Sequence, residues 1–106
     1  MSKKRSFGNL LKSSDLPVLV DFYADWCGPC HTLSPIVKDV ASSLQGRIKV
    51  IKVDVDKNHH AAQTYGIRSI PTLILFFKGR IIWKQAGLMR RKDLMSSIEK
   101  SINNIA

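Results

Sequence analysis

With 106 residues the chain has the length of one small domain, and a hydrophobic content of 44% is enough for a real core. Its two cysteines exclude the dense disulfide framework of small secreted proteins. The net charge of +9 would suit an acidic or nucleic-acid partner. However, the basic residues are spread along the chain without the interleaved aromatic residues of a single-strand-binding groove, which favours a solvated basic exterior.

Residues 1–5 are basic, as at the start of a signal peptide, but no apolar run of about 7–15 residues follows them. We therefore expect no export signal, no transmembrane helix and a cytoplasmic location, where reductants keep thiols reduced. The expected organisation is one domain over residues 1–106, with a flexible segment at 1–5.

The first two expected elements are a short helix over Ser6–Ser14 and a strand over Pro17–Ala24. In the helix, Phe7, Leu10 and Leu11 recur at the i, i+3, i+4 spacing of one face, and the serine at its start is a suitable N-cap. The strand is almost continuously apolar, as in a parallel strand covered on both faces.

Asp21 interrupts this apolar strand. Burying a carboxylate without a partner is unfavourable, so its presence needs a reason. One interpretation places it in a wet crevice without a function. The other makes it a partly buried carboxyl with a raised pKa that lies behind the cysteines and exchanges protons with Cys30 through water.

Cys27 and Cys30 are separated by two residues, at the junction between the first strand and a second helix over Cys27–Leu44. Two cysteines alone cannot form a four-thiolate metal site, but this spacing suits a redox pair that closes and opens a small disulfide ring. The first thiol would lie near the positive end of the helix, which carries roughly +0.5 of a charge and favours a thiolate. Pro35 predicts a kink in this helix, and Gly46 is expected as its C-cap.

A strand over Ile48–Val55 and a short helix over Asn58–Tyr65 follow. Lys52 interrupts the apolar face of that strand and could be an ordinary solvated lysine. The helix carries His59 and His60, but adjacent histidines point in different directions and lack the usual zinc-ligand spacing. We therefore expect no metal site. We expect Asp54 and Asp56 to cap the turn before this helix.

The last part of the chain predicts a loop over Gly66–Pro71, a strand over Thr72–Phe77, a second strand over Arg80–Gln85 and a helix over Arg90–Asn103. A proline at the mouth of a strand is explained by a cis Ile70–Pro71 bond, with a trans proline as the alternative. Together these elements predict an α/β fold with a central mixed sheet of about four strands and helices on both faces.

Several separated motifs resemble the thioredoxin family. The pentapeptide Trp26–Cys30 matches the family's WCGPC active-site sequence letter for letter, with Val20–Ala24 before it, Pro35 in the following helix and Tyr65–Thr72 later in the chain. Gly79 and Gly87 also stand where the family has turns. The similarity extends from about residue 7 to the C-terminus. It implies the thioredoxin fold, here with the N-terminal edge strand missing or truncated because only about five polar and basic residues precede the first helix.

The resemblance implies a protein-disulfide reductase that works by reversible dithiol–disulfide exchange. It makes Cys27 the nucleophile and Cys30 the resolving cysteine, Asp21 the proton acceptor and donor, and Lys52 the residue that tunes that carboxyl. The geometry of the site would depend on Gly28, Pro29 and a cis Pro71, and the substrate would dock on Trp26, Gly66, Ile70 and Gly87.

The resemblance also implies that no cofactor is bound and that electrons come from NADPH through a thioredoxin reductase and pass to disulfide-containing proteins. The sequence does not fix the oligomeric state, and a monomer is the default expectation. Two alternatives remain. One is an exported thiol oxidase or isomerase on the same fold, against which Gly28-Pro29 argues. The other is a non-catalytic adaptor that binds a protein or nucleic-acid complex through its basic surface.

His31 stands where many members of the family have lysine or arginine. A histidine side chain is about half charged near pH 6.5. We therefore predict a modest pH dependence of thiol reactivity that the His31→Lys variant lacks; the alternative is an inert solvated histidine. Rates of disulfide exchange measured across this pH range for both proteins test the prediction, and identical profiles would contradict it.

Overall fold

The computed structural model describes residues 6–105, which form four helices and four strands. In chain order these are α1 (Phe7–Ser13), β1 (Val18–Tyr23), α2 (Gly28–Ser43), β2 (Lys49–Asp54), α3 (His59–Thr64), β3 (Thr72–Phe77), β4 (Arg80–Ala86) and α4 (Arg91–Asn103). The expected flexible segment at 1–5, and any stub of an N-terminal edge strand within it, lie outside the described residues. Within residues 6–105, none of the helices combines the length and hydrophobicity needed to cross a membrane.

The four strands form one mixed sheet in the order β2-β1-β3-β4. β1 and β2 are parallel, whereas β3 pairs antiparallel with both β1 and β4. The predicted α/β architecture with a mixed four-stranded sheet is confirmed. β2 is the outermost strand on its side of the sheet formed by residues 6–105.

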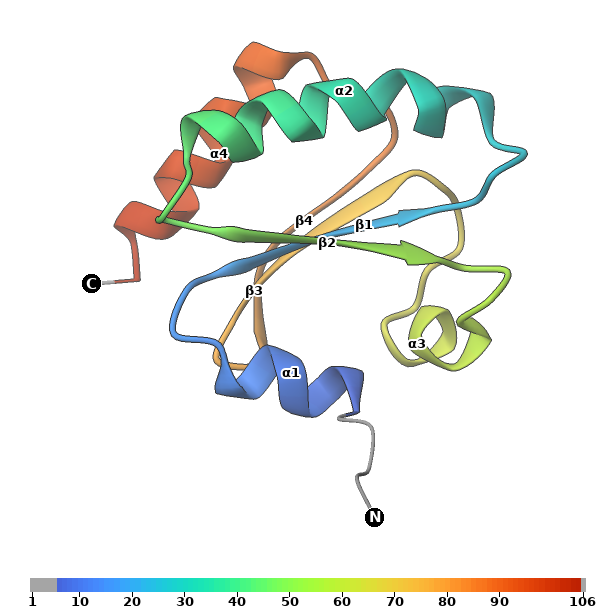
Figure 1. Ribbon diagram of the computed structural model, residues 1–106, viewed down its shortest axis with the longest axis horizontal. Coiled ribbons are helices and arrows are strands. Elements are labelled where there is room, and N and C mark those ends of the chain that lie inside the picture. The colour runs from blue at the N-terminus through green and yellow to red at the C-terminus, as the bar shows by residue number, and fades with distance from the viewer. Residues whose placement is uncertain (1–5, 106) are drawn as a thin grey trace.

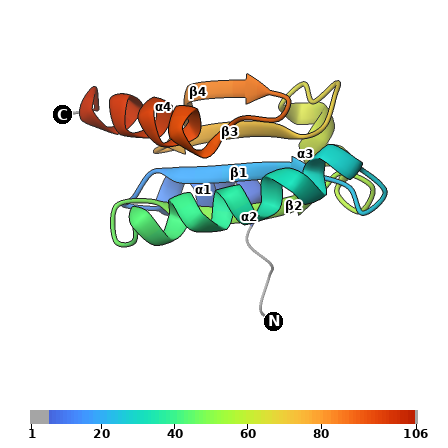
Figure 2. The same ribbon diagram turned by 90° about the horizontal axis from the view of Figure 1, so that it is seen from above.

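Helices cover both faces of the sheet, as predicted. In Figure 1, α2 and α4 lie above the sheet, and α1 and α3 lie below it. Seen from above, α2 lies over the β1 and β2 side and α4 over the β3 and β4 side (Figure 2). Each face therefore encloses its own hydrophobic layer, which fixes the sheet between two layers of helices.

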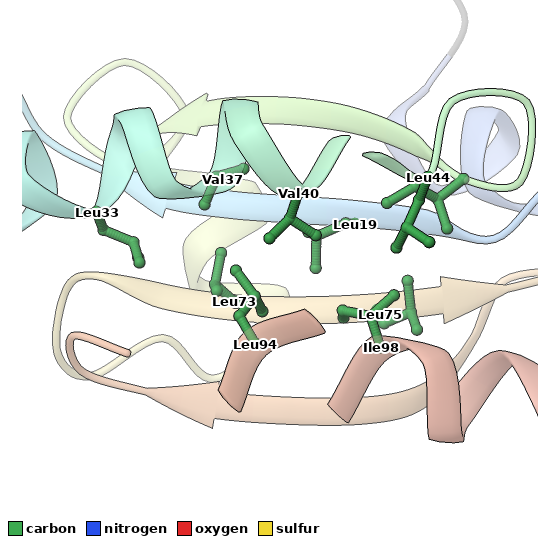
Figure 3. Packing of buried hydrophobic residues seen from close by; sticks show 10 residues of the cluster. Leu19, Leu33, Val37, Val40, Leu44, Leu73, Leu75, Leu94 and Ile98 are labelled. Atoms are coloured by element: carbon green, nitrogen blue, oxygen red, sulfur yellow. The ribbon is translucent and has the colours of Figure 1, made fainter. Parts of the chain in front are cut away.

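The layer beneath α2 and α4 is the larger of the two. Side chains from α2, β1, β3 and α4 point toward one another and meet between the helices and the sheet (Figure 3). They include Leu19, Leu33, Val37, Val40, Leu73, Leu75, Leu94 and Ile98. The opposite layer contains Leu11, Val18, Val20, Phe22, Val53, Ile74 and Phe76. Successive β1 residues alternate between the two layers, which explains the continuous apolar run in its sequence.

The element boundaries differ from the predicted ones by at most one residue, and those of β3 coincide with the prediction. Ser6 caps α1 as predicted, and its hydroxyl accepts a hydrogen bond from the backbone N–H of Asn9. The prediction of Gly46 as the C-cap of α2 is wrong, because Leu44 holds that position. Gly46 lies two residues later with a φ of +85°, a left-handed conformation that glycine adopts without strain.

The leucine side chains in the layer beneath α2 and α4 should contribute much of the free energy of unfolding. Leu75 is fully buried in that layer, so Leu75→Ala should lower the free energy of unfolding by about 2–5 kcal/mol. The matched change Leu88→Ala removes a side chain that is 52% exposed and should cost much less. Urea unfolding of both variants measures the difference, and equal losses would contradict this account of the core.

Candidate active site

The two cysteines form a disulfide at the first turn of α2. Their Cα atoms are 5.3 Å apart. Cys27 is the N-cap of the helix, and its Sγ accepts a hydrogen bond from the backbone N–H of Cys30 at 3.2 Å. Gly28 and Pro29 are the first two helical residues, where the missing N–H of proline leaves no helical hydrogen bond unmade. The predicted placement of the pair at a strand-to-helix junction is confirmed.

The position on the helix distinguishes the two sulfurs, whereas exposure does not. Both cysteines are only 4% exposed, in a small cluster with Ala24. Backbone N–H groups at a helix N-terminus favour negative charge. The Sγ of Cys27 already accepts one of these N–H groups, so a thiolate is better stabilised at Cys27 than at Cys30.

Asp21 lies on the same face of β1 as Leu19, under α2. It is 1% exposed, which does not fit an open, wet crevice. Within residues 6–105, no hydrogen-bond partner is found for its Oδ1 atom. Burial raises the pKa of the Asp21 carboxyl above its ordinary value, and the charge of Lys52 partly offsets this increase. The raised pKa expected from the sequence is therefore confirmed.

Lys52 is directly opposite Asp21 in the register of the parallel β1–β2 pair. Its Nζ donates a hydrogen bond to Ser34 Oγ at 3.1 Å and lies 4.5 Å from the centre of the Tyr23 ring. The ammonium group is thus close enough to Asp21 to act on it by charge, although its hydrogen bond goes to α2.

The Ile70–Pro71 peptide bond is cis, as the sequence predicts. Pro71 immediately precedes β3, and Ile70 packs against the cysteine cluster. A shallow groove of about 190 Å³ lies beside it, formed by residues that precede α2, follow β2 and precede β3. The groove is lined by Trp26, Val55, Ile67, Arg68, Ser69 and Ile70.

Trp26 is 72% exposed, an unusual value for a large aromatic side chain next to a buried pair of cysteines. Its indole Nε1 donates a hydrogen bond to Asp56 Oδ2 at 2.8 Å. The sequence predicts only a turn-capping role for Asp56. In the structure Asp54 caps the turn, because its Oδ1 accepts a hydrogen bond from the backbone N–H of Asp56. The sequence signal for the Trp26 contact was weak: both residues follow the carboxyl ends of neighbouring parallel strands, which meet at one edge of the sheet.

The groove lining does not include Gly66 or Gly87, two of the four residues predicted to dock a substrate. Gly66 follows α3 with a φ of +65°, a conformation that explains the glycine locally. The backbone N–H of Gly87 donates to the carbonyl of Pro71 at 2.8 Å, so Gly87 ties the end of β4 to the cis peptide.

The three histidines lie apart from the cysteine chemistry or at its rim. His31 Nε2 is 2.6 Å from the carbonyl oxygen of Asp25, which holds the ring against the loop before the cysteines. His59 and His60 are in the first turn of α3. Among residues 6–105, no three His, Cys, Asp or Glu side chains come together as a group that could hold a metal ion.

Comparison with known proteins gives one consistent family. The family model described as Thioredoxin matches residues 1–100. The chain is 47% identical over 97 residues to the protein named Thioredoxin of Rickettsia conorii, with 92% of each chain covered. It is 43% identical to Thioredoxin 1 of a Nostoc species, covering 92% of this chain and 91% of the relative. It is 40% identical to Thioredoxin 1 of Chlorobaculum tepidum, covering 92% and 97%.

Asp21 should make stability fall as pH rises. Its folded-state pKa lies above the ordinary value of 3.8, so the folded protein holds this proton more tightly than the unfolded chain. The stability that this proton contributes is therefore fully present below pH 3.8 and is lost as pH rises through the folded-state pKa. Asp21→Asn has no proton to lose at this position, so relative to wild type it should gain about 1.4 kcal/mol for each pH unit by which the folded-state pKa exceeds the unfolded one.

Urea unfolding of the oxidised proteins, repeated across this pH range, measures the effect. Asp15→Asn is a matched control, because Asp15 is an exposed carboxylate on the surface. If the stability of wild type and Asp21→Asn changes in parallel with pH, the assignment of this dependence to Asp21 is wrong.

Proposed function

The chain belongs to the thioredoxin family of dithiol–disulfide oxidoreductases, and from this premise we propose that it reduces disulfide bonds in other proteins. Its redox group is the Cys27–Cys30 pair. The observation that supports the order of the steps is the hydrogen bond from the Cys30 N–H to the Cys27 Sγ, whereas the reductive direction rests on the similarity to thioredoxins. The hydrogen bond stabilises negative charge on the cysteine that has to attack first.

In the first step, the Cys27 thiolate attacks one sulfur of the substrate disulfide. A mixed disulfide forms between Cys27 and the substrate, and the other substrate sulfur leaves as a thiolate. Attack depends on the thiolate fraction, which for an ordinary thiol of pKa about 8.5 is only about 3% at pH 7. The first-turn N–H of α2 raises this fraction at Cys27.

In the second step, the Cys30 thiol loses its proton, and its sulfur attacks Cys27 Sγ. The Cys27–Cys30 disulfide forms, and the second substrate sulfur leaves as a thiolate, so two electrons have passed to the substrate. Asp21 is the proton acceptor. Its raised pKa brings it closer to the pH at which it must take up a proton, which suits a general base. Lys52 limits the increase by favouring the carboxylate.

The substrate docks across the groove beside the disulfide. Trp26 and Ile70 provide apolar surface at its two sides. The cis bond before Pro71 leaves the backbone of Ile70 available to pair with an extended substrate segment, as in strand addition. Gly87 supports this arrangement by its bond to the Pro71 carbonyl, and Gly66 allows the turn that leads into the loop. Gly28 and Pro29 allow the close approach of the two sulfurs.

The protein receives its electrons from a thioredoxin reductase that uses NADPH, and it works as a single-domain monomer. A pair that is repeatedly re-reduced requires a reducing compartment, which supports a cytoplasmic location. Nucleic acid is not the expected partner, because the basic residues are spread along the chain without the interleaved aromatic residues of a single-strand-binding groove. Some of them also pair with carboxylates: Arg47–Glu99, Lys78–Asp15, Arg90–Asp93 and Arg91–Asp39.

The purified protein should reduce insulin disulfides with dithiothreitol as electron donor. Cys27→Ser and Cys30→Ser should each lose turnover, a fall of several orders of magnitude for a covalent step. Reduced Cys30→Ser, once dithiothreitol has been removed, should also accumulate a mixed disulfide with the substrate, seen by mass spectrometry, because the Cys27 thiol can attack but no second thiol is present to resolve the product. No activity from a folded, fully reduced wild-type sample would overturn the proposed reductase function.

A further inference from the structure

The Lys52 ammonium group has a defined position above the face of the sheet that carries Asp21. Its Nζ is 3.1 Å from Ser34 Oγ and 4.5 Å from the centre of the Tyr23 ring. Lys52 is an exposed residue of β2, and Ser34 is a residue of α2. The hydroxyl therefore links the strand that carries the lysine to the helix that carries the cysteines.

Ser34 is also well placed with respect to the chemistry. It lies four residues after Cys30 on α2, so the two side chains are one helical turn apart on the same face. Asp21 is opposite Lys52 in the β1–β2 register, on the face that α2 covers. Ser34 thus holds Lys52, whose charge counteracts the effect of burial on the pKa of Asp21.

A lysine needs such an anchor if its charge is to act from a constant distance. The energy between two charges varies inversely with their separation and with the local dielectric constant. The lysine stem is flexible, and its ammonium is strongly hydrated, so a free Lys52 side chain would spend more of its time turned toward water. Among the described residues, Asp21 Oδ1 accepts no hydrogen bond from Lys52, so the anchor that the structure shows for the ammonium is the Ser34 hydroxyl.

We propose that Ser34 is a positioning residue of the redox site: its hydroxyl holds the Lys52 ammonium at a fixed distance from the Asp21 carboxyl and so sets how readily that carboxyl accepts the Cys30 proton. This inference rests on the proposed roles of Asp21 and Lys52. Ser34 does not line the groove beside the disulfide, and its proposed effect is exerted only through the lysine.

The surroundings of Asp21 leave few other groups that could have this effect. β3 places the apolar Leu73 beside it, and the buried α4 residues of this layer, Leu94 and Ile98, are also apolar. The titratable or charged groups on this face of the neighbouring elements are Tyr23 of β1, Lys52 and Asp54 of β2, and Cys30 of α2. Asp54 is already bonded to the backbone N–H of Asp56.

A surface hydrogen bond without a functional role would have a different signature. Contacts of an exposed lysine typically contribute about 0–1 kcal/mol to stability, so unfolding experiments cannot distinguish the two roles. The titration of Asp21 can distinguish them. Without the Ser34 hydroxyl, the ammonium moves toward solvent, its effect weakens, and the pKa of Asp21 should rise further above its ordinary value.

The experiment is a pH titration of the Asp21 carboxyl carbon by NMR, on the oxidised protein. We expect the Ser34→Ala midpoint to move to higher pH, by no more than the Lys52→Met midpoint moves. Ser34→Thr keeps a hydroxyl and should restore the wild-type midpoint. Ser42→Ala, which changes an exposed serine on the same helix, should leave it unchanged. In reduced protein, the rate at which the mixed disulfide is resolved should shift to higher pH in the same order.

An unchanged midpoint in Ser34→Ala, beside a shifted one in Lys52→Met, would overturn the inference, because the lysine would then act without its anchor. An unchanged midpoint in Lys52→Met would overturn it at its premise, together with the proposed role of Lys52. Both midpoints are measured on the protein itself, without a substrate or a reductase. The proposed reductase function is tested separately by insulin turnover, so the two failures can be told apart.

Discussion

The junction between β1 and α2 is the constraint on which the rest of the site depends. A helix that starts in a protein interior leaves backbone N–H groups without helical partners. Here the sulfur of Cys27 accepts one of them, from Cys30. The same contact ends the loop, caps the helix and favours negative charge on the sulfur. One hydrogen bond therefore both completes the start of the helix and favours the thiolate that the cysteine chemistry needs.

Asp21 shows the opposite relation between stability and function. A leucine or valine at this position of β1 would extend the layer beneath α2, but the chain buries a carboxyl there, and one of its oxygens has no hydrogen-bond partner within residues 6–105. The cost is offset by the burial of the hydrophobic residues that form the cluster in this layer. The burial that makes Asp21 unfavourable for folding also brings its pKa toward the range that a proton acceptor needs.

Much of this fold and part of the site could be predicted from the sequence. The strands and helices carry clear periodicity, and the two cysteines, Asp21 and the cis Pro71 each break a local rule in a recognisable way. The partners of exposed side chains could not be predicted. The Trp26–Asp56 and Lys52–Ser34 hydrogen bonds join residues 30 and 18 positions apart, and no local pattern specifies them. They depend on how the strand ends meet and on the angle of α2 across the sheet.

Within residues 6–105, β2 lies at the edge of the sheet, which has a consequence for self-association. In its parallel pairing, the backbone groups of Lys49 and Val55 bond to the β1 side, so those of alternate residues, Val50 and Lys52, face away from β1. Such an edge is a template on which further strands can add and aggregates can grow. The exposed Lys49 and Lys52 put two positive charges along this strand. Two copies that met edge to edge would bring like charges together, which opposes the growth of a continuous sheet.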